Sequence, residues 1–440
     1  MSLSRFTFTD RARPIAQLGI GEVRNSSTAA WDSARWNNAA ARWGGNDPSW
    51  RDVSCEQFSF EMIAGRRAAT DRFEVATGTL YARNVSGWAD PHHFDAPTGT
   101  TVRPGQQMRV GVDHATLGRV WLFHGYIDAI TPRYEPGEPD TVQFDLIDAL
   151  GEVNRAKVAS GSTLAASETV HYRIARLLDH AGWPITRRHL DNTTFTVIAS
   201  AINGQIADLV SQAADSAGGA VFGRNDGWVV FRRQDWQTYL AGTPPDGIIG
   251  NVDPGDLCPQ GWVRPFARAD ITTRAIFGRD PATARTHDDP AGIATYGIEP
   301  FERTDLLTST DAELDQIAAR VMQTRAAATA PRVRGVTIDA RHGDAYVDLL
   351  TSLDLFKPSR YRCRLELERG LVFDADHFAT GVHHRLDAHG WAADINLDVA
   401  APYLANPGHW DGATWDNAVW SDVAAVLAEA RALLDREPAP

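Results

Sequence analysis

The chain of 440 residues is poor in cysteine and in long apolar runs, and each shortage removes a class of protein. Cys55, Cys258 and Cys363 are isolated and have neither metal-binding spacing nor a disulfide framework, so we expect small buried apolar side chains. No run reaches the roughly 18 apolar residues of a membrane span, and the polar first ten residues do not resemble a signal peptide. These features predict a protein without a membrane segment that is made in a cytoplasm.

Positive charge is also scarce. The 43 basic residues, of which only Lys157 and Lys357 are lysines, stand against 56 acidic ones, and the net charge is −13. Proteins that hold nucleic acid neutralise its phosphates with basic patches, which requires the opposite balance. The charge therefore argues against a protein that binds nucleic acid. A surplus of carboxylates also serves to keep a protein soluble.

Motifs of common enzymes are missing as well, including the phosphate-binding loop, the G-x-S-x-G turn and the H-E-x-x-H helix. One polar cluster could in principle hold a metal ion, because it combines imidazoles with carboxylates. The structural alternative is a pair of strands over 378–385 and 391–399, with His383 and His384 on opposite faces. We favour the strands, and so predict no catalytic, metal-binding or cofactor-binding residue and no cofactor. The cluster comprises Asp374, Asp376, His377, His383, His384, Asp387 and His389.

Hydrophobic patterning divides the chain into two β-rich regions and a mixed one. Residues 58–62 and 142–146 alternate apolar and polar side chains, as half-buried strands do, which makes residues 1–155 a candidate β-barrel domain. Residues 156–242 carry a helical stripe at 170–181, a strand at 195–198, a helix capped by Asn203 and a hairpin at 220–231. We expect a β-α-β-β module there.

The hydrophobic pattern of residues 243–402 predicts a second β-barrel domain that contains one helix. The helix begins at the capping box formed by Thr310 and Glu313, and strands follow at 335–340 and 391–399. Residues 403–440 form a tryptophan-rich segment and an amphipathic helix that Ser421 caps. The predicted fold class is therefore β-rich α+β.

A short tryptophan repeat occurs twice, at residues 31–39 and 410–418. Its five-residue spacing fits neither a helical stripe nor one face of a strand, so these segments are expected to be irregular loops that place indoles on a surface. That surface is either the protein's own core or a partner, since tryptophan serves both purposes. The candidate partner interface consists of Trp31, Trp36, Trp43, Trp410, Trp415 and Trp420.

The order of motifs in residues 50–150 resembles the N-terminal region of minor tail proteins of siphophages that infect actinobacteria and other high-GC hosts. The resemblance rests on TGTLYARN at 77–84, FHGYID at 123–128 and FDLIDAL at 144–150. IARLLDHAGWP at 174–184 resembles the middle module of the same family, and residues 382–391 resemble its closing hairpin. Together these pieces cover about two-thirds of the chain.

The resemblance implies a tail-tip or baseplate hub with two β-barrel domains related to tail-tube proteins. Such hubs are homotrimers around the tail axis, so two barrels per chain give the six that a hexameric tube presents. The implied partners are the distal tail protein, the tape measure protein and other tail-tip proteins, with the genome passing through without specific binding. The implied location is the tail tip of the virion, and a gene transfer agent or tail-like bacteriocin would use the same part.

Two other functions stay open at this point. The 14 tryptophans are also typical of a protein that binds host-surface glycans or a receptor. Some tail hubs carry cell-wall-degrading domains, but such a domain would need an additional module with a catalytic constellation. We therefore expect a non-enzymatic structural protein.

Overall fold

The computed structural model describes residues 11–20, 49–53, 58–66, 71–91, 102–164, 168–234, 244–263, 271–325, 333–355, 359–367, 371–387 and 390–400. Contacts divide the chain into two units, Met1–Leu404 and Ala405–Pro440, and all described residues lie in the first. The six candidate interface tryptophans and the predicted C-terminal helix lie outside the described residues.

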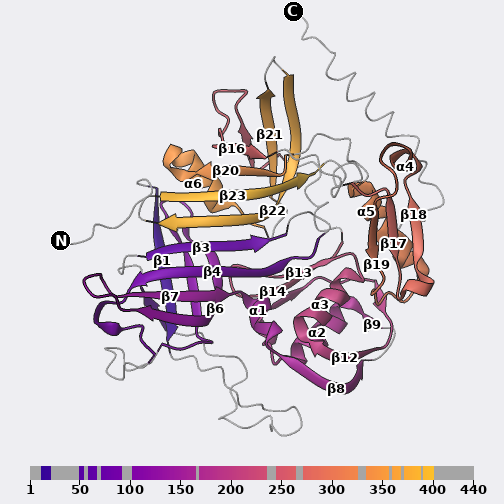
Figure 1. Ribbon diagram of the computed structural model, residues 1–440, viewed down its shortest axis with the longest axis horizontal. Helices are drawn as coiled ribbons and strands as arrows, with labels where there is room; N and C mark the ends of the chain where they lie inside the picture. The colour runs from indigo at the N-terminus through magenta and orange to yellow at the C-terminus, as the bar shows by residue number, and fades with distance from the viewer. Residues whose placement is uncertain are drawn as a thin grey trace, which may run out of the picture. The chain divides into compact units, whose positions relative to one another are not determined.

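A 13-stranded sheet forms the centre of the first unit (Figure 1). Its neighbours pair antiparallel, except where β15 (Gly247–Gly250) runs parallel to β21 (Arg360–Leu367), which in turn pairs with β22. The other strands follow one path, in the order β16 (Gly261–Val263), β20 (Gly335–Asp339), β23 (Gly390–Val399), β22 (Leu371–Asp387), β3 (Phe58–Gly65), β4 (Glu74–Arg83), β7 (Thr141–Ile147), β6 (Gly118–Arg133), β5 (Gln107–His114), β1 (Ala12–Ile20) and β2 (Ser49–Asp52).

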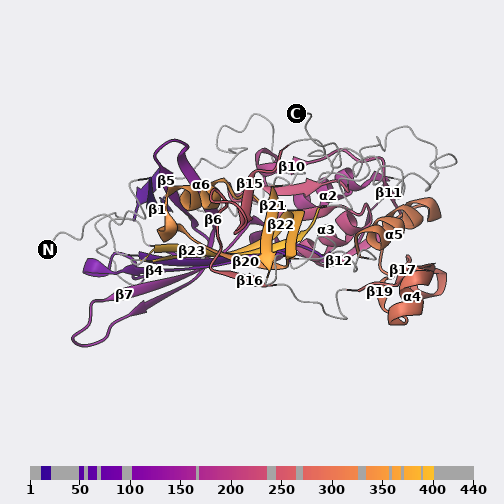
Figure 2. The same ribbon diagram turned by 90° about the horizontal axis from the view of Figure 1, so that it is seen from above.

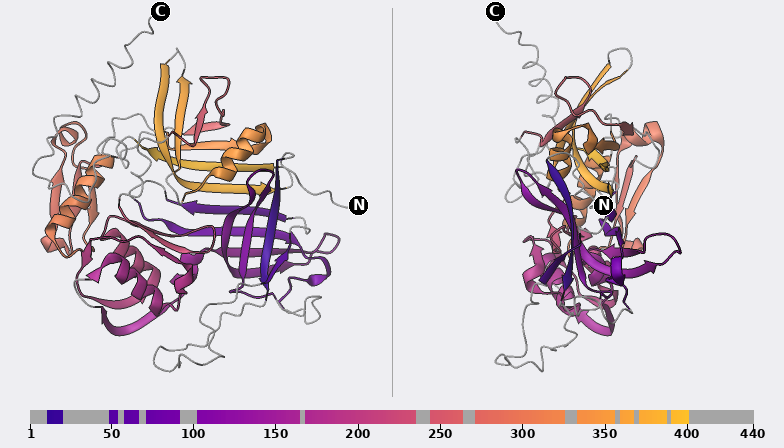
Figure 3. Two further views of the ribbon diagram at one scale, coloured as in Figure 1. Left: turned by 180° about the vertical axis from the view of Figure 1, so that it is seen from behind. Right: turned by 90° about the vertical axis from the view of Figure 1, so that its left-hand side faces the viewer.

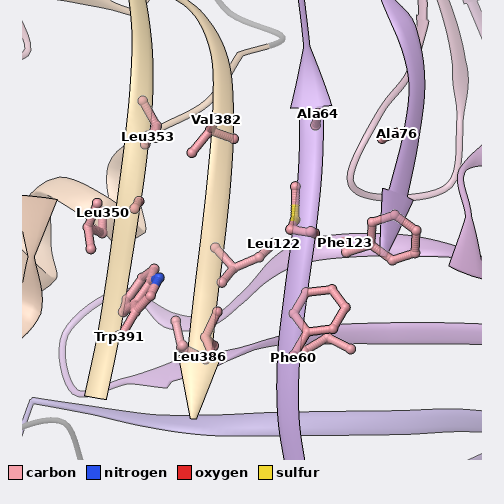
Figure 4. Close-up of a cluster of buried hydrophobic side chains, with 14 of the residues drawn as sticks. Phe60, Ala64, Ala76, Leu122, Phe123, Leu350, Leu353, Val382, Leu386 and Trp391 are labelled. Carbon is pink, nitrogen blue, oxygen red and sulfur yellow. The ribbon is translucent and has the colours of Figure 1, made fainter. Parts of the chain in front are cut away.

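The two predicted β-rich regions share this sheet, because β22 pairs with β3. We call the β3–β22 pairing the seam. One hydrophobic core runs across it and includes Phe60 and Phe123 from the N-terminal strands and Leu386 and Trp391 from the C-terminal ones (Figure 4). β-rich architecture is thus confirmed, whereas two separate closed barrels are not what the described strands form. The predicted domain boundaries at 155, 242 and 402 stay predictions.

Two glycines allow the backbones to approach closely at the seam. Gly65 has a φ of 106°, and a Cβ there would lie 2.4 Å from both the Cα of Gly381 and the carbonyl oxygen of Thr380. Arg66 N donates to that same carbonyl at 2.8 Å. A side chain at position 65 would therefore meet both an unfavourable φ and a backbone clash.

The helix α6 (Asp344–Ser352) covers the buried face of the C-terminal strands (Figure 2). It also reaches the N-terminal strands, since Arg11 binds Asp348 through two hydrogen bonds of 2.8 and 2.9 Å. The buried ring of His114, on β5, contacts the same carboxylate at 2.8 Å. The sequence did not predict this helix: Gly343 precedes it, and no side chain caps it.

The α+β module is built on α2 (Val170–His180) and α3 (Ile206–Asp215), with a core of its own. The helical stripe at 170–181 and the hairpin of β13 (Ala220–Gly223) and β14 (Val229–Arg232) are confirmed. Two details differ from the prediction: Gln205 rather than Asn203 is the N-cap, and β10 (Arg188–Leu190) completes the sheet. The predicted strand at 195–198 is the two-residue β11 (Thr196–Val197), which pairs with β9 (Glu168–Thr169).

Short elements connect the α+β module to the 13-stranded sheet, and a further strand pair accompanies the module. α1 (Ala149–Asn154) follows β7, and the buried carboxylate of Asp148 accepts from Gly151 N and from Ala76 N on β4. Burial raises the pKa of Asp148 to about 6, because its effect is larger than that of the three backbone hydrogen bonds, which lower the pKa. A separate strand pair consists of β8 (Lys157–Leu164) and β12 (Ser200–Gln205).

A third core lies in residues 271–325, which we call the small module (Figure 3). Its sheet consists of β17 (Arg274–Phe277) between β18 (Arg285–Asp288) and β19 (Pro300–Arg303). The predicted helix is α5 (Asp311–Arg325), and its capping box is confirmed by Glu313 N donating to Thr310 Oγ1 at 3.3 Å and Thr310 N donating to Glu313 Oε2 at 3.1 Å. Residues 243–402 hold α4 (Pro290–Tyr296) and α6 as well as α5, so the prediction of one helix there was wrong.

The small module meets the rest of the unit through polar groups, at what we call the joint. Asp215 at the end of α3 binds Arg72 at 2.5 Å and also binds Arg303 of β19. Backbone bonds of 2.8 and 3.0 Å join Ile198 to Leu307 and Ser309 to Thr196. Apolar contacts come from Phe195, which packs against the cores on both sides, and from Leu307, which packs against the core of the α+β module.

The cysteines follow the prediction only in part. Cys363 on β21 is buried, and burial raises the pKa of its thiol to about 12. Cys258 is exposed, so the expectation of a buried side chain was wrong there. No helix in the described ranges combines the length and the apolar character that crossing a membrane requires.

Candidate functional site

The central strands turn every second side chain away from the core and so build a continuous polar face. The burial of β3, β7 and β23 alternates along each strand, as half-buried strands require. We call the outward residues of β20, β23, β22, β3, β4 and β7 the polar face. Its members include Thr337, Asp394, His383, Arg385, Glu61, Thr79, Tyr81, Gln143 and Asp145.

Hydrogen bonds between side chains cross the seam on this face. Asp394 on β23 accepts from Thr337 and from Arg385, each at 2.7 Å. His383 on β22 lies 2.5 Å from Glu61 of β3 and 3.7 Å from Asp394. The network thus spans four adjacent strands and connects residues that lie 322 positions apart in the sequence.

The Asp394 carboxylate is held in its charged form. Burial raises its pKa, but hydrogen bonds from Arg385 and Thr337 and the nearby charges outweigh burial, and the pKa is lowered overall. Its side chain is 41% exposed, so the group faces solvent rather than a closed pocket. An ionised carboxylate therefore lies beside the seam, paired with the guanidinium of Arg385.

Most charged groups of the polar face are carboxylates. One register row runs from Arg385 through Glu61 and Thr79 to Asp145, across four strands. Gln143 donates to Asp145 at 2.8 Å. Ile63 and Tyr81 interrupt the polar surface with exposed fractions of 54% and 41%. The carboxylates are Glu61, Asp145, Asp387, Asp394 and Asp398, the guanidinium groups on these strands are Arg83 and Arg385, and Arg334 and Arg133 contact the face at Asp398 and Gln143.

The opposite side of β22 is apolar, as adjacent positions on a strand require. His384 is buried and accepts from Trp391 Nε1 at 3.1 Å. Burial and the neighbouring His383 lower the pKa of His384 to about 3, so its ring is neutral. The prediction that His383 and His384 point to opposite faces is confirmed.

The rest of the polar cluster at 374–389 disperses over several partners. Asp374 forms two hydrogen bonds with Arg362, of 2.7 and 2.8 Å, and Asp376 lies 3.7 Å from Arg360. His377 is buried and accepts from Val333 N at 3.2 Å. Asp387 accepts from Gly390 N, while His389 lies outside the described residues. Within the described ranges, no three such side chains are arranged to hold a metal ion.

Five of the described tryptophans lie in the core or stack on a single arginine. Trp88, Trp183 and Trp391 are almost completely buried. Trp50 and Trp121 enclose the guanidinium of Arg109, which lies 3.8 and 4.2 Å from the two ring centroids. These indoles stabilise the fold, whereas the six tryptophans predicted to bind a partner are not among them.

Sequence reasoning missed Glu61, Arg385 and Asp394 as a connected group. Each residue's outward position follows from alternation, which the sequence displays. Their connection depends on which strand lies beside which, and no local signal near Glu61 indicates a partner in β22. The pairing therefore had to come from the structure.

Comparisons with known proteins bear on the fold. No family model matches the chain, and no curated protein matches it by sequence. A tail protein from Neisseria meningitidis MC58 is similar with a TM-score of 0.54 and 15% identity, over 79% of this chain and 93% of that one. The 43 kDa tail protein of prophage MuSo2 from Shewanella oneidensis has a TM-score of 0.52 and 10% identity, over 89% and 99% of the two chains. The chain thus has the fold of these two tail proteins.

Proposed function

We propose that the chain is a structural subunit of a bacteriophage tail that forms the tail-tip or baseplate hub. The observation that carries this proposal is the single sheet across the seam, because it makes two β-rich halves one rigid wall with one polar face. The likeness to two tail proteins supports the same assignment. In this role the protein closes the tail tube, organises its neighbours and belongs to the virion.

The active assembly is a homotrimer with the polar face toward the axis. Each chain then contributes two tube-like halves, and three chains give six around a channel. The carboxylates of the polar face repel phosphate over a Debye length of about 8 Å, which favours passage of DNA over binding. Glu61, Asp145 and Asp394 supply this charge, and the bonds of Asp394 to Arg385 and Thr337 keep it in place.

The partners in this proposal are the distal tail protein, the tape measure protein and other tail-tip proteins. The two tryptophan repeats are the proposed contacts, since indoles bury much area with few rotatable bonds. Replacing Trp410 and Trp415 together with Ala is expected to leave the sheet folded and to impair tail assembly. Loss of the fold in the isolated double variant would assign these indoles to the core instead.

The proposed role is non-enzymatic. Glu61, His383, Arg385 and Asp394 of the polar face pair with one another across strands, which accounts for these four as structural residues. Glycan binding, the other function considered, would use exposed indoles. The described tryptophans named above are buried or stacked on Arg109, so they do not favour it.

The first test is the mass and symmetry of the purified protein. Light scattering should give three times the chain mass of 48.1 kDa, and electron microscopy should place the polar face around a channel. A monomer would contradict the trimer. A trimer whose channel is lined continuously by arginine would contradict the assignment of the face.

The second test reverses charge on the polar face. Glu61→Arg combined with Asp145→Arg should create duplex-DNA binding at about 0.15 M salt, measured by fluorescence anisotropy, because phosphates would then meet a basic wall. Asp208→Arg on the exposed side of α3 is the matched control and should bind less. Tight duplex binding by the unaltered trimer would overturn the proposed DNA passage.

A further inference from the structure

The small module is inserted between two strands of the 13-stranded sheet that pair with each other. β16 and β20 are antiparallel neighbours (Figure 1), with Val263 opposite Gly335. Arg334 N donates to Val263 O at 2.8 Å, so the pairing continues to the very end of β16. The chain therefore leaves the sheet after Val263 and returns to it at the same place. Turning the inserted residues about that place breaks no strand pair of the sheet.

The small module has a core of its own, and the residues that reach the joint are fixed to that core. Leu306 N donates to Gly278 O at 3.1 Å, directly after β17. Arg279 Nε donates to Thr308 O at 2.6 Å. The segment that contacts the α+β module therefore moves with the small module as one body. The buried core residues are Ala275, Phe277, Leu306, Leu314, Ile317, Ala318 and Val321.

Five charged side chains meet at the joint, and we call them the latch. Asp215 at the end of α3 binds Arg72 at 2.5 Å and also binds Arg303 of β19. Arg325, the last residue of α5, binds Asp71 at 2.7 Å. The side chains of Arg72 and Asp71 are 41% and 37% exposed, so dissolved ions screen both pairs. Asp215, Arg303 and Arg325 are more enclosed, so removing one of them leaves a poorly compensated charge.

The remaining contacts at the joint involve little apolar surface. Residues 196–198 and 307–309 form two backbone hydrogen bonds, of 2.8 and 3.0 Å, about an isolated bridge. Water replaces such bonds at a small net cost. Val197 is buried at the bridge, whereas Phe195 and Leu307 beside it are only half-buried. Because a continuous apolar core lies beneath the seam, parting the joint costs much less than parting the two halves of the sheet.

We infer that the small module is a hinged flap, which turns as one body about the connections to β16 and β20 when the latch opens. The structure shows the closed position, in which the latch and the bonds of residues 196–198 hold the module against its neighbour. In the open position the sheet keeps its strand pairs and the module keeps its core. Surface residues of the module such as Ile298, which is 51% exposed, then change position relative to the sheet. This inference does not depend on the proposed function.

Distances between spin labels measure the opening in the full chain. In a Cys55→Ser, Cys258→Ser background that retains the buried Cys363, Ile298→Cys labels the small module and Ile185→Cys labels the α+β module, both at exposed positions. Labelled chains are diluted with unlabelled protein, so that double electron–electron resonance reports distances within one chain. One distance should dominate at about 0.02 M salt. A second population should appear at about 0.5 M salt, because the Debye length falls from about 20 Å to about 4 Å.

Two controls identify the small module as the moving part. Labels at Ile185→Cys and Leu117→Cys, both outside the small module and both exposed, should show one distance at every salt concentration. Thr196→Cys with Ser309→Cys should lock the flap by a disulfide, because the two native hydroxyls hydrogen-bond to each other across the joint. With the disulfide formed before maleimide spin labels are attached, the second population should be absent, and reduction should restore it.

Removing a charge from the latch gives an independent readout. Arg303→Gln leaves Asp215 with one guanidinium partner fewer and should raise the ratio of open to closed chains about tenfold at about 0.15 M salt. Arg274→Gln, which removes an exposed pair with Asp288 inside the module, is the matched control and should leave the ratio unchanged.

Three results would overturn the hinge and leave the proposed function intact. The first is a single distance at every salt concentration, both in the unaltered latch and in Arg303→Gln. The second is a second population that persists in the locked variant. The third is a loss of helical circular dichroism in step with the second population, because the module would then unfold instead of turning.

Discussion

The seam and the joint connect parts of one unit in opposite ways. At the seam, backbone hydrogen bonds between β3 and β22 continue one sheet, and an apolar core runs beneath it. At the joint, Asp215 binds Arg72 and Arg303, and Phe195 and Leu307 supply apolar contacts. The seam relies on burial of apolar area, and the joint relies mainly on charge and hydrogen bonds.

This difference predicts which of the two connections opens more easily. Salts such as sulfate strengthen apolar burial, whereas partly exposed ion pairs weaken as salt rises. Removing one partner of a well-enclosed pair also leaves an unpaired charge. We therefore expect the two sheet halves to unfold together, and the small module to open before they do.

The largest effect is expected from emptying the core at the seam. Trp391 is 0% exposed, and its ring packs near His384. Trp391→Ala should lower the free energy of unfolding by about 3–5 kcal/mol, because it leaves a cavity and an unpaired imidazole. Urea denaturation followed by circular dichroism measures it. Retained stability would show that the seam does not depend on this core.

A smaller effect is expected at the backbone contact of the seam. Gly65→Ala should lower the free energy of unfolding by about 3 kcal/mol, because both φ and the clash with Gly381 are unfavourable. Gly118→Ala is the matched control, since Gly118 has a φ of 72° and open space around it. Equal losses in the two variants would mean that φ alone matters and that the close approach does not.

Removing a charge at the joint should destabilise the small module and leave the sheet unaffected. Asp215→Asn should lower the opening free energy of the small module by about 2 kcal/mol, since Arg72 and Arg303 lose a shared carboxylate. Hydrogen exchange should rise in residues 274–325 and stay unchanged in β22 and β23. Asp288→Asn, which removes an exposed pair inside the small module, should leave hydrogen exchange there almost unchanged. Equal changes in both regions would show that the small module does not open separately from the sheet.

The smallest effect is a dependence on pH that belongs to the seam. Folding lowers the pKa of His384 to about 3, so the unfolded chain takes up the proton first as pH falls below about 6.5. The stability that the neutral imidazole contributes is fully present above about pH 6.5. It falls by about 1.4 kcal/mol for each further pH unit of acidification. Unfolding free energies at about pH 7 and 5.5 should therefore differ less in His384→Gln than in the unaltered protein. Parallel pH profiles would contradict a neutral buried imidazole.

The elements that the sequence predicts well are those with local signals. The capping box of Thr310 and Glu313 lies within four residues and gave the start of α5. The apolar stripe of α2 and the turn at Gly227, whose φ is 82°, are equally local. These signals act between near neighbours, so they do not depend on the rest of the fold.

The parts that the sequence did not predict depend on distant contacts. β10 has three residues and is stabilised by its parallel pairing with β14, and α6 lacks a side-chain cap. Likewise, the alternation in β3 places Glu61 outward, but its contact with His383 depends on the seam. The candidate site was therefore predictable as polar positions on single strands and not as one face.

The seam also orders events during synthesis. β3 leaves the ribosome long before β22, and the intervening chain takes roughly 15–60 s to make at cellular rates of translation. Until then the N-terminal strands form a nascent sheet with an unpaired edge, which is prone to pair with the wrong chain. Glu61 places a charge on that edge strand, in the position that discourages intermolecular pairing. Glu61, which contacts His383 across the seam in the folded protein, thus also discourages wrong pairing of the nascent N-terminal strands.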